Sequence, residues 1–163
     1  SLTTHADIAQ MIEICAQNLV ENNRDKFAAD DFAAKGFLIR KLTKEDVEEM
    51  LADQENYFSC VAKNGDEVLG YLTGCDVRKS GINCFKNAPE IENFKNQKPF
   101  YHKQIVKKPD AKNVGTELLQ AMFDEAKHRN YSQIICRIVQ APFFKRGKRF
   151  LGKRFLFGSY DAV

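Results

Sequence analysis

The chain has 163 residues, of which 44% are hydrophobic and 29% are charged, and this balance is typical of one soluble globular domain spanning residues 1–163. No apolar run approaches the roughly 18 residues of a membrane span, and no basic segment precedes an apolar core at the N-terminus. We therefore expect a cytoplasmic protein without a signal peptide, and the early start of the first helix leaves open whether the chain is trimmed at both ends. The net charge of +3 says little about partners.

The first half of the chain contains helical patterns followed by a hairpin. Residues 6–22 carry apolar side chains at helical spacing, a weaker helical pattern covers 26–34, and a strand pattern begins at Gly36. Thr43, with Asp46 three residues later, resembles a capping box and predicts a helix to about residue 52. Two apolar runs between residues 57 and 76 flank Asn64-Gly65, which predicts a β-hairpin.

The second half alternates strands with one strong helix. Residues 76–98 are polar and lack a clean period, so we expect a long loop or insertion there. Residues 100–107 and 132–139 have strand patterns, and residues 114–129 form the clearest amphipathic helix. Residues 143–153 are ambiguous, and 154–160 are compatible with a last strand. This order predicts an α/β fold with a mixed sheet.

The cysteines and histidines suggest no metal centre. None of the five cysteines forms a C-x-x-C pair, and with the three scattered histidines they make no zinc pattern. We interpret the cysteines as reduced thiols, mostly buried, and expect no bound metal.

The turn between residues 109 and 116 is a candidate anion site. A helix start presents unpaired N–H groups and a partial positive charge, which favour phosphate. Gly115 lies one residue into the predicted helix, where the lack of a Cβ would let a phosphate approach. One glycine is weak evidence, and an ordinary strand-to-helix turn is the alternative.

In this region the chain resembles the GNAT acetyltransferase superfamily. The signature of that family is a strand, a turn of the form Q/R-x-x-G-x-G/A, and a helix whose first amides hold the pyrophosphate of acetyl-CoA. Gly115 matches the last position, whereas Asp110 stands where Gln or Arg is usual and Asn113 where the first Gly is usual. The stretches ADIAQMIEICAQNL, GFLIRKLTKEDVEEMLAD, YFSCVAKNGDEVLGYLTG and FYHKQIVKKP extend the likeness over nearly the whole chain. The resemblance implies one α/β/α layered domain with a mostly antiparallel central sheet.

The resemblance also implies a function, a co-substrate and binding residues. The resemblance implies that the chain is an N-acetyltransferase and that a primary amine attacks the thioester of acetyl-CoA directly. The expected acceptor is a small molecule, a peptide N-terminus or a lysine. The oligomeric state stays open between a monomer and a homodimer. The positions carried over for acetyl-CoA are Ile105, Val106, Lys107, Asp110, Ala111, Lys112, Asn113, Val114, Gly115 and Thr116.

The catalytic groups are harder to assign. No carboxylate lies at residues 100–107, so His102, Tyr101 and Gln104 are the candidates, with His102 as the base because its ordinary pKa is near neutrality. Strand alternation puts His102 and Gln104 on one face of the sheet, and it puts Tyr101 and Lys103 on the other. The position matching the family's acidic Tyr falls near Leu151, which cannot donate a proton.

Residues 145–154, KRGKRFLGKR, hold six basic residues and no acid. Three interpretations stay open: a solvated basic face, a site for the 3′-phosphate of CoA through Lys145 and Arg146, or a surface for RNA or another acidic partner. Nucleic acid is the least favoured. A catalytically degenerate relative that binds CoA or a basic-surface partner is the alternative to an enzyme.

Overall fold

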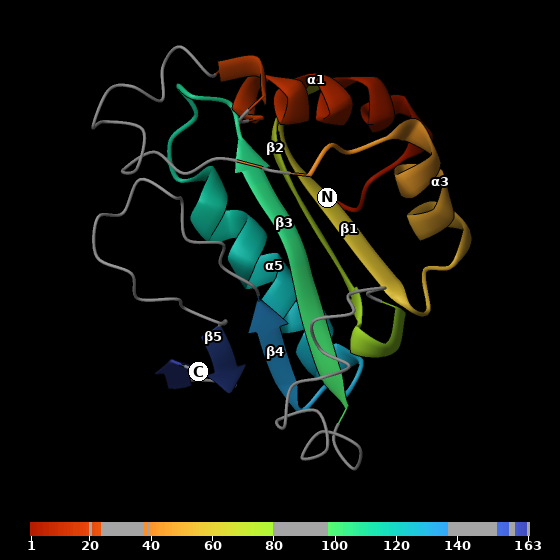
Figure 1. Ribbon diagram of the computed structural model, residues 1–163, viewed down its shortest axis with the longest axis vertical. Helices are drawn as coiled ribbons and strands as arrows, with labels where there is room; N and C mark the ends of the chain where they lie inside the picture. Colours follow the sequence, from red (N-terminus) through yellow and green to blue (C-terminus); the bar gives the residue numbers. More distant parts are fainter. Residues whose placement is uncertain are drawn as a thin grey trace.

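The computed structural model in Figure 1 describes residues 1–19, 21–23, 38, 40–79 and 98–136, and the backbone of two strands at 153–156 and 159–162. The elements are η1 (His5–Asp7), α1 (Ile8–Asn18), α3 (Lys44–Ala52), β1 (Tyr57–Asn64), β2 (Glu67–Asp76), η3 (Val77–Lys79), β3 (Pro99–Lys107), α5 (Val114–His128), β4 (Gln133–Cys136), β5 (Lys153–Leu156) and β6 (Ser159–Ala162). No helix in this described part is long and apolar enough to cross a membrane. The predicted helix at 26–34 and most of the predicted loop at 76–98 lie outside the described residues, as does the ambiguous stretch up to residue 152.

The six strands form one sheet in the order β1-β2-β3-β4-β5-β6. All neighbouring pairs are antiparallel except β3 and β4, which run parallel from Pro99 beside Gln133 to His102 beside Cys136. A parallel pair requires a crossover, and α5 supplies it. The predicted mixed and mostly antiparallel sheet is confirmed.

Helices cover both faces of the sheet. On one face, α1 and α3 pack with side chains such as Val61, Tyr71 and Cys75 into one apolar core. On the other face, α5 packs with Leu72, Phe100 and other buried residues into a second core. Figure 1 shows α1 and α3 at the top and right of the sheet and α5 crossing behind β3 and β4. Alternating strand residues feed the two cores, which gives the predicted α/β/α layering.

Local signals set the helix boundaries. The Thr43 side chain accepts a hydrogen bond from the Asp46 amide at 3.1 Å, and the Asp46 carboxylate accepts one from the Thr43 amide at 2.9 Å. This reciprocal pair confirms the predicted capping box and satisfies two donors at the start of α3. The first helix, predicted to residue 22, instead ends at Asn18, because Leu19 is extended (φ −73°, ψ 138°) and forms a parallel bridge with Leu38.

Two sequence predictions about turns and ends are corrected. The strands of the hairpin stay paired through Asn64 and Glu67, so the turn consists of Gly65 and Asp66 and not of Asn64 and Gly65. Gly65 has a φ of 61°, which glycine adopts without strain. The sequence is compatible with a single last strand at 154–160, but two paired strands, β5 and β6, form at this end of the described residues.

The N-terminal residues pair with the edge strand β1. The Thr3 amide donates to the Ser59 carbonyl at 3.0 Å, and the Val61 amide donates to the Ser1 carbonyl at 2.8 Å. Leu2 lies between these bonds as an antiparallel bridge partner of Cys60. The short segment therefore covers part of the outer edge of β1.

Candidate functional site

The turn between β3 and α5 is held together through its carbonyl groups. The Ala111 amide donates to the Lys108 carbonyl at 3.1 Å, and the Lys108 amide donates to the Leu69 carbonyl on β2 at 2.8 Å. The Lys107 ammonium donates to the carbonyls of Ala111 at 2.9 Å and Pro109 at 3.3 Å. These hydrogen bonds to carbonyl groups hold the turn in place. They do not use the amides at the start of α5.

The first turn of α5 presents unpaired amides. Asn113 is the N-cap in a left-handed conformation (φ 61°, ψ −3°), and its side chain makes no capping hydrogen bond. Its carbonyl accepts the first helical bond, from the Glu117 amide at 3.4 Å. Within the described residues the amides of Val114, Gly115 and Thr116 have no acceptor. Three adjacent N–H groups at the positive end of a 15-residue helix form a site for an anion.

Gly115 leaves open space at this helix start. A Cβ built on Gly115 would meet no atom within 4 Å. The side chain of Val114, 4% exposed, anchors the helix in the core, while Asn113 and Thr116 are exposed. The turn therefore combines unpaired amides with open space over Gly115, although its sequence departs from the family signature.

A second glycine, on β2, allows this geometry. A Cβ on Gly70 would lie 2.7 Å from Cγ1 of Val114 and 2.8 Å from the carbonyl oxygen of Val106. Only glycine lets the first turn of α5 approach the sheet this closely. The sequence pattern does not reveal this role of Gly70, because its contact with Val114 joins residues more than forty positions apart.

Strand β3 contains a β-bulge, and the bulge overturns the predicted side-chain alternation. Thr73 of β2 pairs with Gln104, but the next residue, Gly74, pairs with His102, so Lys103 is an extra residue on β3. An extra residue reverses the alternation beyond it. His102 therefore lies on the α5 face, opposite Gly74, whereas Gln104 lies on the α1/α3 face.

His102 does not lie with the other two catalytic candidates. Its ring is half-buried, and within the described residues its buried Nε2 atom has no hydrogen-bond partner. Burial lowers the pKa of His102 to about 4, so the ring is neutral near pH 7. Tyr101, 5% exposed, lies opposite Cys75 and contributes to the α1/α3 core. The three candidates are thus divided between the two faces of the sheet.

Both ends of the Gln104 amide have protein partners. The Tyr71 hydroxyl donates to Gln104 Oε1 at 3.1 Å, and Gln104 Nε2 donates to the Arg40 carbonyl at 2.8 Å. Burial raises the pKa of Tyr71, which keeps its hydroxyl protonated as a donor. These contacts fasten the segment before α3 to β3, so the structure gives Gln104 a positioning role.

The other predicted binding residues lie along β3 and its turn. Val106 is buried, Ile105 is half-buried against the α5 core, and Lys107 is exposed at the end of the strand. Asp110 and Lys112 are exposed in the turn, and Ala111 is half-buried. Lys145 and Arg146 lie outside the described residues.

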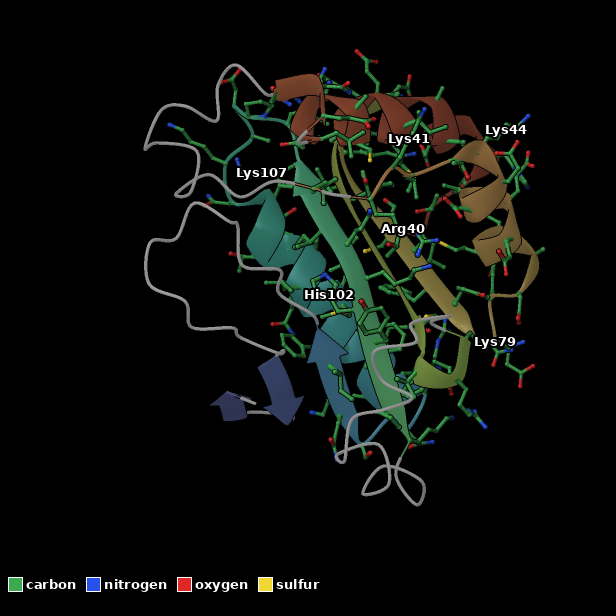
Figure 2. The ribbon with its side chains drawn as sticks, viewed as in Figure 1. Arg40, Lys41, Lys44, Lys79, His102 and Lys107 are labelled. Carbon is green, nitrogen blue, oxygen red and sulfur yellow. The ribbon has the colours of Figure 1, made fainter. Side chains whose placement is uncertain are left out.

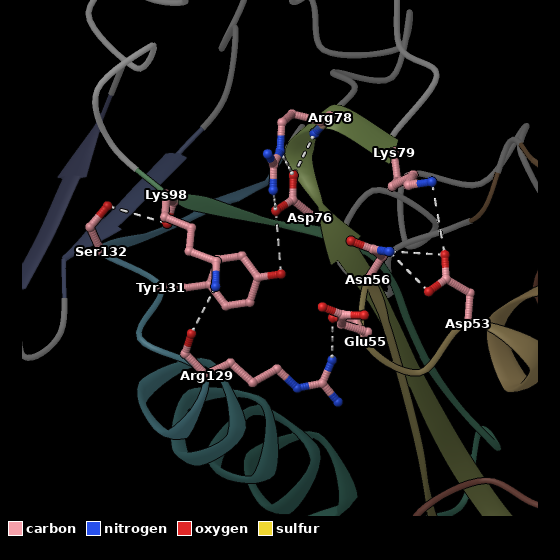
Figure 3. A network of polar contacts seen from close by, with 10 residues as sticks. All are labelled: Asp53, Glu55, Asn56, Asp76, Arg78, Lys79, Lys98, Arg129, Tyr131 and Ser132. Carbon is pink, nitrogen blue, oxygen red and sulfur yellow. Dashed lines mark hydrogen bonds and ion pairs between the residues drawn. The ribbon is translucent and has the colours of Figure 1, made fainter.

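The opposite end of the sheet carries a structural ion-pair network (Figure 3). Asp76, 2% exposed, accepts hydrogen bonds from the Arg78 guanidinium at 2.8 and 2.7 Å and from the Tyr131 hydroxyl at 3.5 Å. Burial opposes ionisation of Asp76, but the Arg78 hydrogen bonds outweigh it and hold the pKa of this carboxyl below its ordinary value. The Lys98 ammonium lies 4.7 Å from the centre of the Tyr131 ring. The network fastens the end of β2 to the start of β4.

No protein-family model matches the chain, and no curated protein matches its sequence. Solved structures do match. The Paia N-acetyltransferase from Thermoplasma acidophilum, in complex with coenzyme A, is 12% identical, with a TM-score of 0.56 over 88% of this chain and 80% of that one. An N-acetyltransferase from Staphylococcus aureus Mu50 is 16% identical, with a TM-score of 0.55 over 88% and 74% of the two chains.

A third match is the ribosomal-protein-alanine N-acetyltransferase from Brucella melitensis. It is 16% identical, with a TM-score of 0.54 over 83% of this chain and 71% of that one. These likenesses confirm the predicted GNAT fold.

Proposed function

We propose that this chain, which has the GNAT fold, is an acetyl-CoA-dependent N-acyltransferase that acts on a primary amine. The observation that carries the proposal is the row of unpaired amides at Val114, Gly115 and Thr116, with open space over Gly115. In this fold the site directly follows β3, whose residues Ile105–Lys107 would line the acyl and pantetheine groups. The amides would hold the pyrophosphate of acetyl-CoA.

The residues present fit a phosphate group. The N–H donors and the helix dipole favour negative charge, and the exposed Lys112 adds a cation in the same turn. Asp110 is exposed in that turn, where its carboxylate is screened by water. The acetyl thioester of acetyl-CoA supplies the acyl carbon, to which the acceptor nitrogen bonds as the C–S bond breaks and the CoA thiol is released.

His102 is proposed as a proton acceptor only through water, because its buried Nε2 atom lies on the α5 face of the sheet. With a pKa of about 4 the ring is neutral and able to accept, but it is a weak base. Water carrying the proton from the attacking amine to bulk solvent would serve the same purpose.

A CoA-binding protein without turnover is the second candidate. It is favoured by the low pKa of His102 and by the engagement of both ends of the Gln104 amide. The two candidates share the CoA site and differ only in acyl transfer.

The first test is a calorimetric titration of the protein with acetyl-CoA, followed by transfer assays with a panel of primary amines. The Gly115→Asp variant should lose binding, because a carboxylate would occupy the proposed phosphate position. Gln120→Asp is the matched control, since it adds the same charge to an exposed position of the same helix and should bind normally. Normal acetyl-CoA affinity in Gly115→Asp would contradict the proposed site.

Two further results of the same experiment test the predicted 3′-phosphate contact and distinguish an enzyme from a CoA-binding protein without turnover. Weaker binding of dephospho-CoA would support the predicted contact of Lys145 and Arg146 with the 3′-phosphate. Binding of acetyl-CoA without acetylation of any amine would favour the second candidate.

A further inference from the structure

The face of the sheet that carries α1 and α3 presents two polar side chains at the middle of β3. The α5 core fills the opposite face, where Leu72 and Phe100 are at most 1% exposed. On the α1/α3 face, Lys103 and Gln104 are half-buried, as His102 and Ile105 are on the α5 face. An amine that approaches β3 from the α1/α3 face passes Lys103 and Gln104.

The bulge turns a lysine toward that approach. Lys103 and Gln104 together oppose Thr73, whose side chain lies on the α1/α3 face. Cys75, two residues further along β2, belongs to the core on this face. Burial raises the pKa of the Cys75 thiol to about 12; the Lys103 ammonium lowers this pKa, and the Asp76 and Glu49 carboxylates raise it.

Gln104 holds a second cationic residue, Arg40, close to β3. Its hydrogen bond to the Arg40 carbonyl holds the Arg40 backbone against β3, one residue from Lys103. The Arg40 and Lys41 side chains are exposed. Figure 2 shows Arg40, Lys41 and Lys44 along the segment that enters α3, to the right of β3. We call Arg40, Lys41 and Lys103 the cationic group.

Three acidic side chains of α3 have partners of their own. Glu48 pairs with Lys44 at 3.5 Å, and Glu49 accepts a hydrogen bond from the Tyr57 hydroxyl at 3.0 Å. Asp46 caps the amide of Thr43. By contrast, no ion pair involves any member of the cationic group among the residues that the structure describes. Among the described residues, Lys103 is half-buried and forms no ion pair, which favours an anionic ligand.

Resting on the proposed function, we infer that the acceptor amine also carries a carboxylate, which pairs with Lys103 and Arg40 while the amine faces β3. This names the acceptor class as an acidic amine, in which the carboxylate is either a free α-carboxylate or an acidic side chain next to a peptide N-terminus. The arginine provides a planar, two-donor contact for such a group, and the lysine provides a point charge.

The test compares kcat/KM for matched acceptors at 50 mM salt. Alanyl-alanine against its C-terminal amide probes the free α-carboxylate, and alanyl-glutamate amide against alanyl-glutamine amide probes the side-chain carboxylate. In at least one pair we expect the acidic member to be preferred by about tenfold, equivalent to about 1.4 kcal/mol. The preference should shrink at 500 mM salt.

Variants assign the preference to the cationic group. Lys103→Gln and Arg40→Gln should each remove most of it while acetyl-CoA affinity stays unchanged, and Lys103→Arg should retain it. Lys79→Gln is the matched control, because Lys79 is an exposed lysine at the far end of β2 that pairs with Asp53. Equal rates for both members of both pairs, or a preference that survives both glutamine variants, would overturn the inference.

Failure of the proposed function gives a different result. If acetyl-CoA does not bind and no amine is acetylated, the proposed function fails, and the inference is judged by binding alone. Alanyl-glutamate amide should then bind to the wild-type protein in a calorimetric titration about tenfold more tightly than alanyl-glutamine amide does, equivalent to about 1.4 kcal/mol. The same titration compares alanyl-alanine with its C-terminal amide, and equal binding within both pairs would refute the acidic-acceptor assignment.

Discussion

The Gly115→Ala substitution should change stability and acetyl-CoA affinity in opposite directions. Gly115 lies in the first turn of α5 without a positive φ, and an added Cβ meets no atom within 4 Å. Alanine in such a helical position stabilises a protein by about 0.5–1 kcal/mol, because glycine loses more backbone entropy on folding. For a domain of this size, about 1 kcal/mol raises Tm by roughly 2–4 °C.

The same methyl group lies where the proposed phosphate would approach the amides. We expect an affinity loss of about tenfold, equivalent to about 1.4 kcal/mol. With acetyl-CoA at about 100 times the wild-type Kd, the ligand stabilises the wild-type protein by about 2.7 kcal/mol and the variant by about 1.4 kcal/mol. The variant should then be less stable than the wild type by about 0.3–0.8 kcal/mol, despite its higher stability without ligand.

Thermal unfolding with and without acetyl-CoA measures this crossing, which is a reversal in the order of the two melting temperatures. The variant should melt at the higher temperature alone, and the wild type should melt at the higher temperature with ligand. Gln120→Ala, at an exposed position further along α5, should show no crossing. If the variant keeps its advantage at saturating acetyl-CoA, the amides of this helix start do not hold the phosphate. A loss of stability without ligand would instead refute the open space over Gly115.

Three other predictions concern stability. Between about pH 6.5 and pH 4, the unfolded chain binds a proton at His102 that the folded protein does not bind. The free energy of unfolding should therefore fall by up to about 1.4 kcal/mol for each pH unit of acidification. Urea titrations of His102→Gln should show a smaller dependence on pH. Gly74→Ala should cost about 1–3 kcal/mol, because a Cβ there lies 2.4 Å from the ring of Phe100; an unchanged urea midpoint would contradict this close contact. Thr43→Ala should cost about 1 kcal/mol through the loss of its contact with Asp46, and a cost within error of zero would show that the cap does not stabilise α3.

Features that depend on neighbours in sequence were predictable. The Thr43–Asp46 capping box and the 15-residue helix α5 arise from side chains within one or two turns of each other, so their spacing is visible in the chain. The strand–turn–helix around Gly115 belongs to the same class. Its open amides follow from helix geometry alone, once the helix start is known.

Features that depend on distant partners required the folded structure. The bulge at Lys103 exists only because β3 pairs with β2, and strand alternation without it placed His102 and Gln104 on the same face. The partners of Gln104 lie 33 and 64 residues away, at Tyr71 and Arg40. A strand pattern records which residues are apolar, but a pairing register depends on two strands at once. The placement of His102 and Gln104 on opposite faces, and of Lys103 beside the Arg40 backbone, therefore depends on the folded sheet.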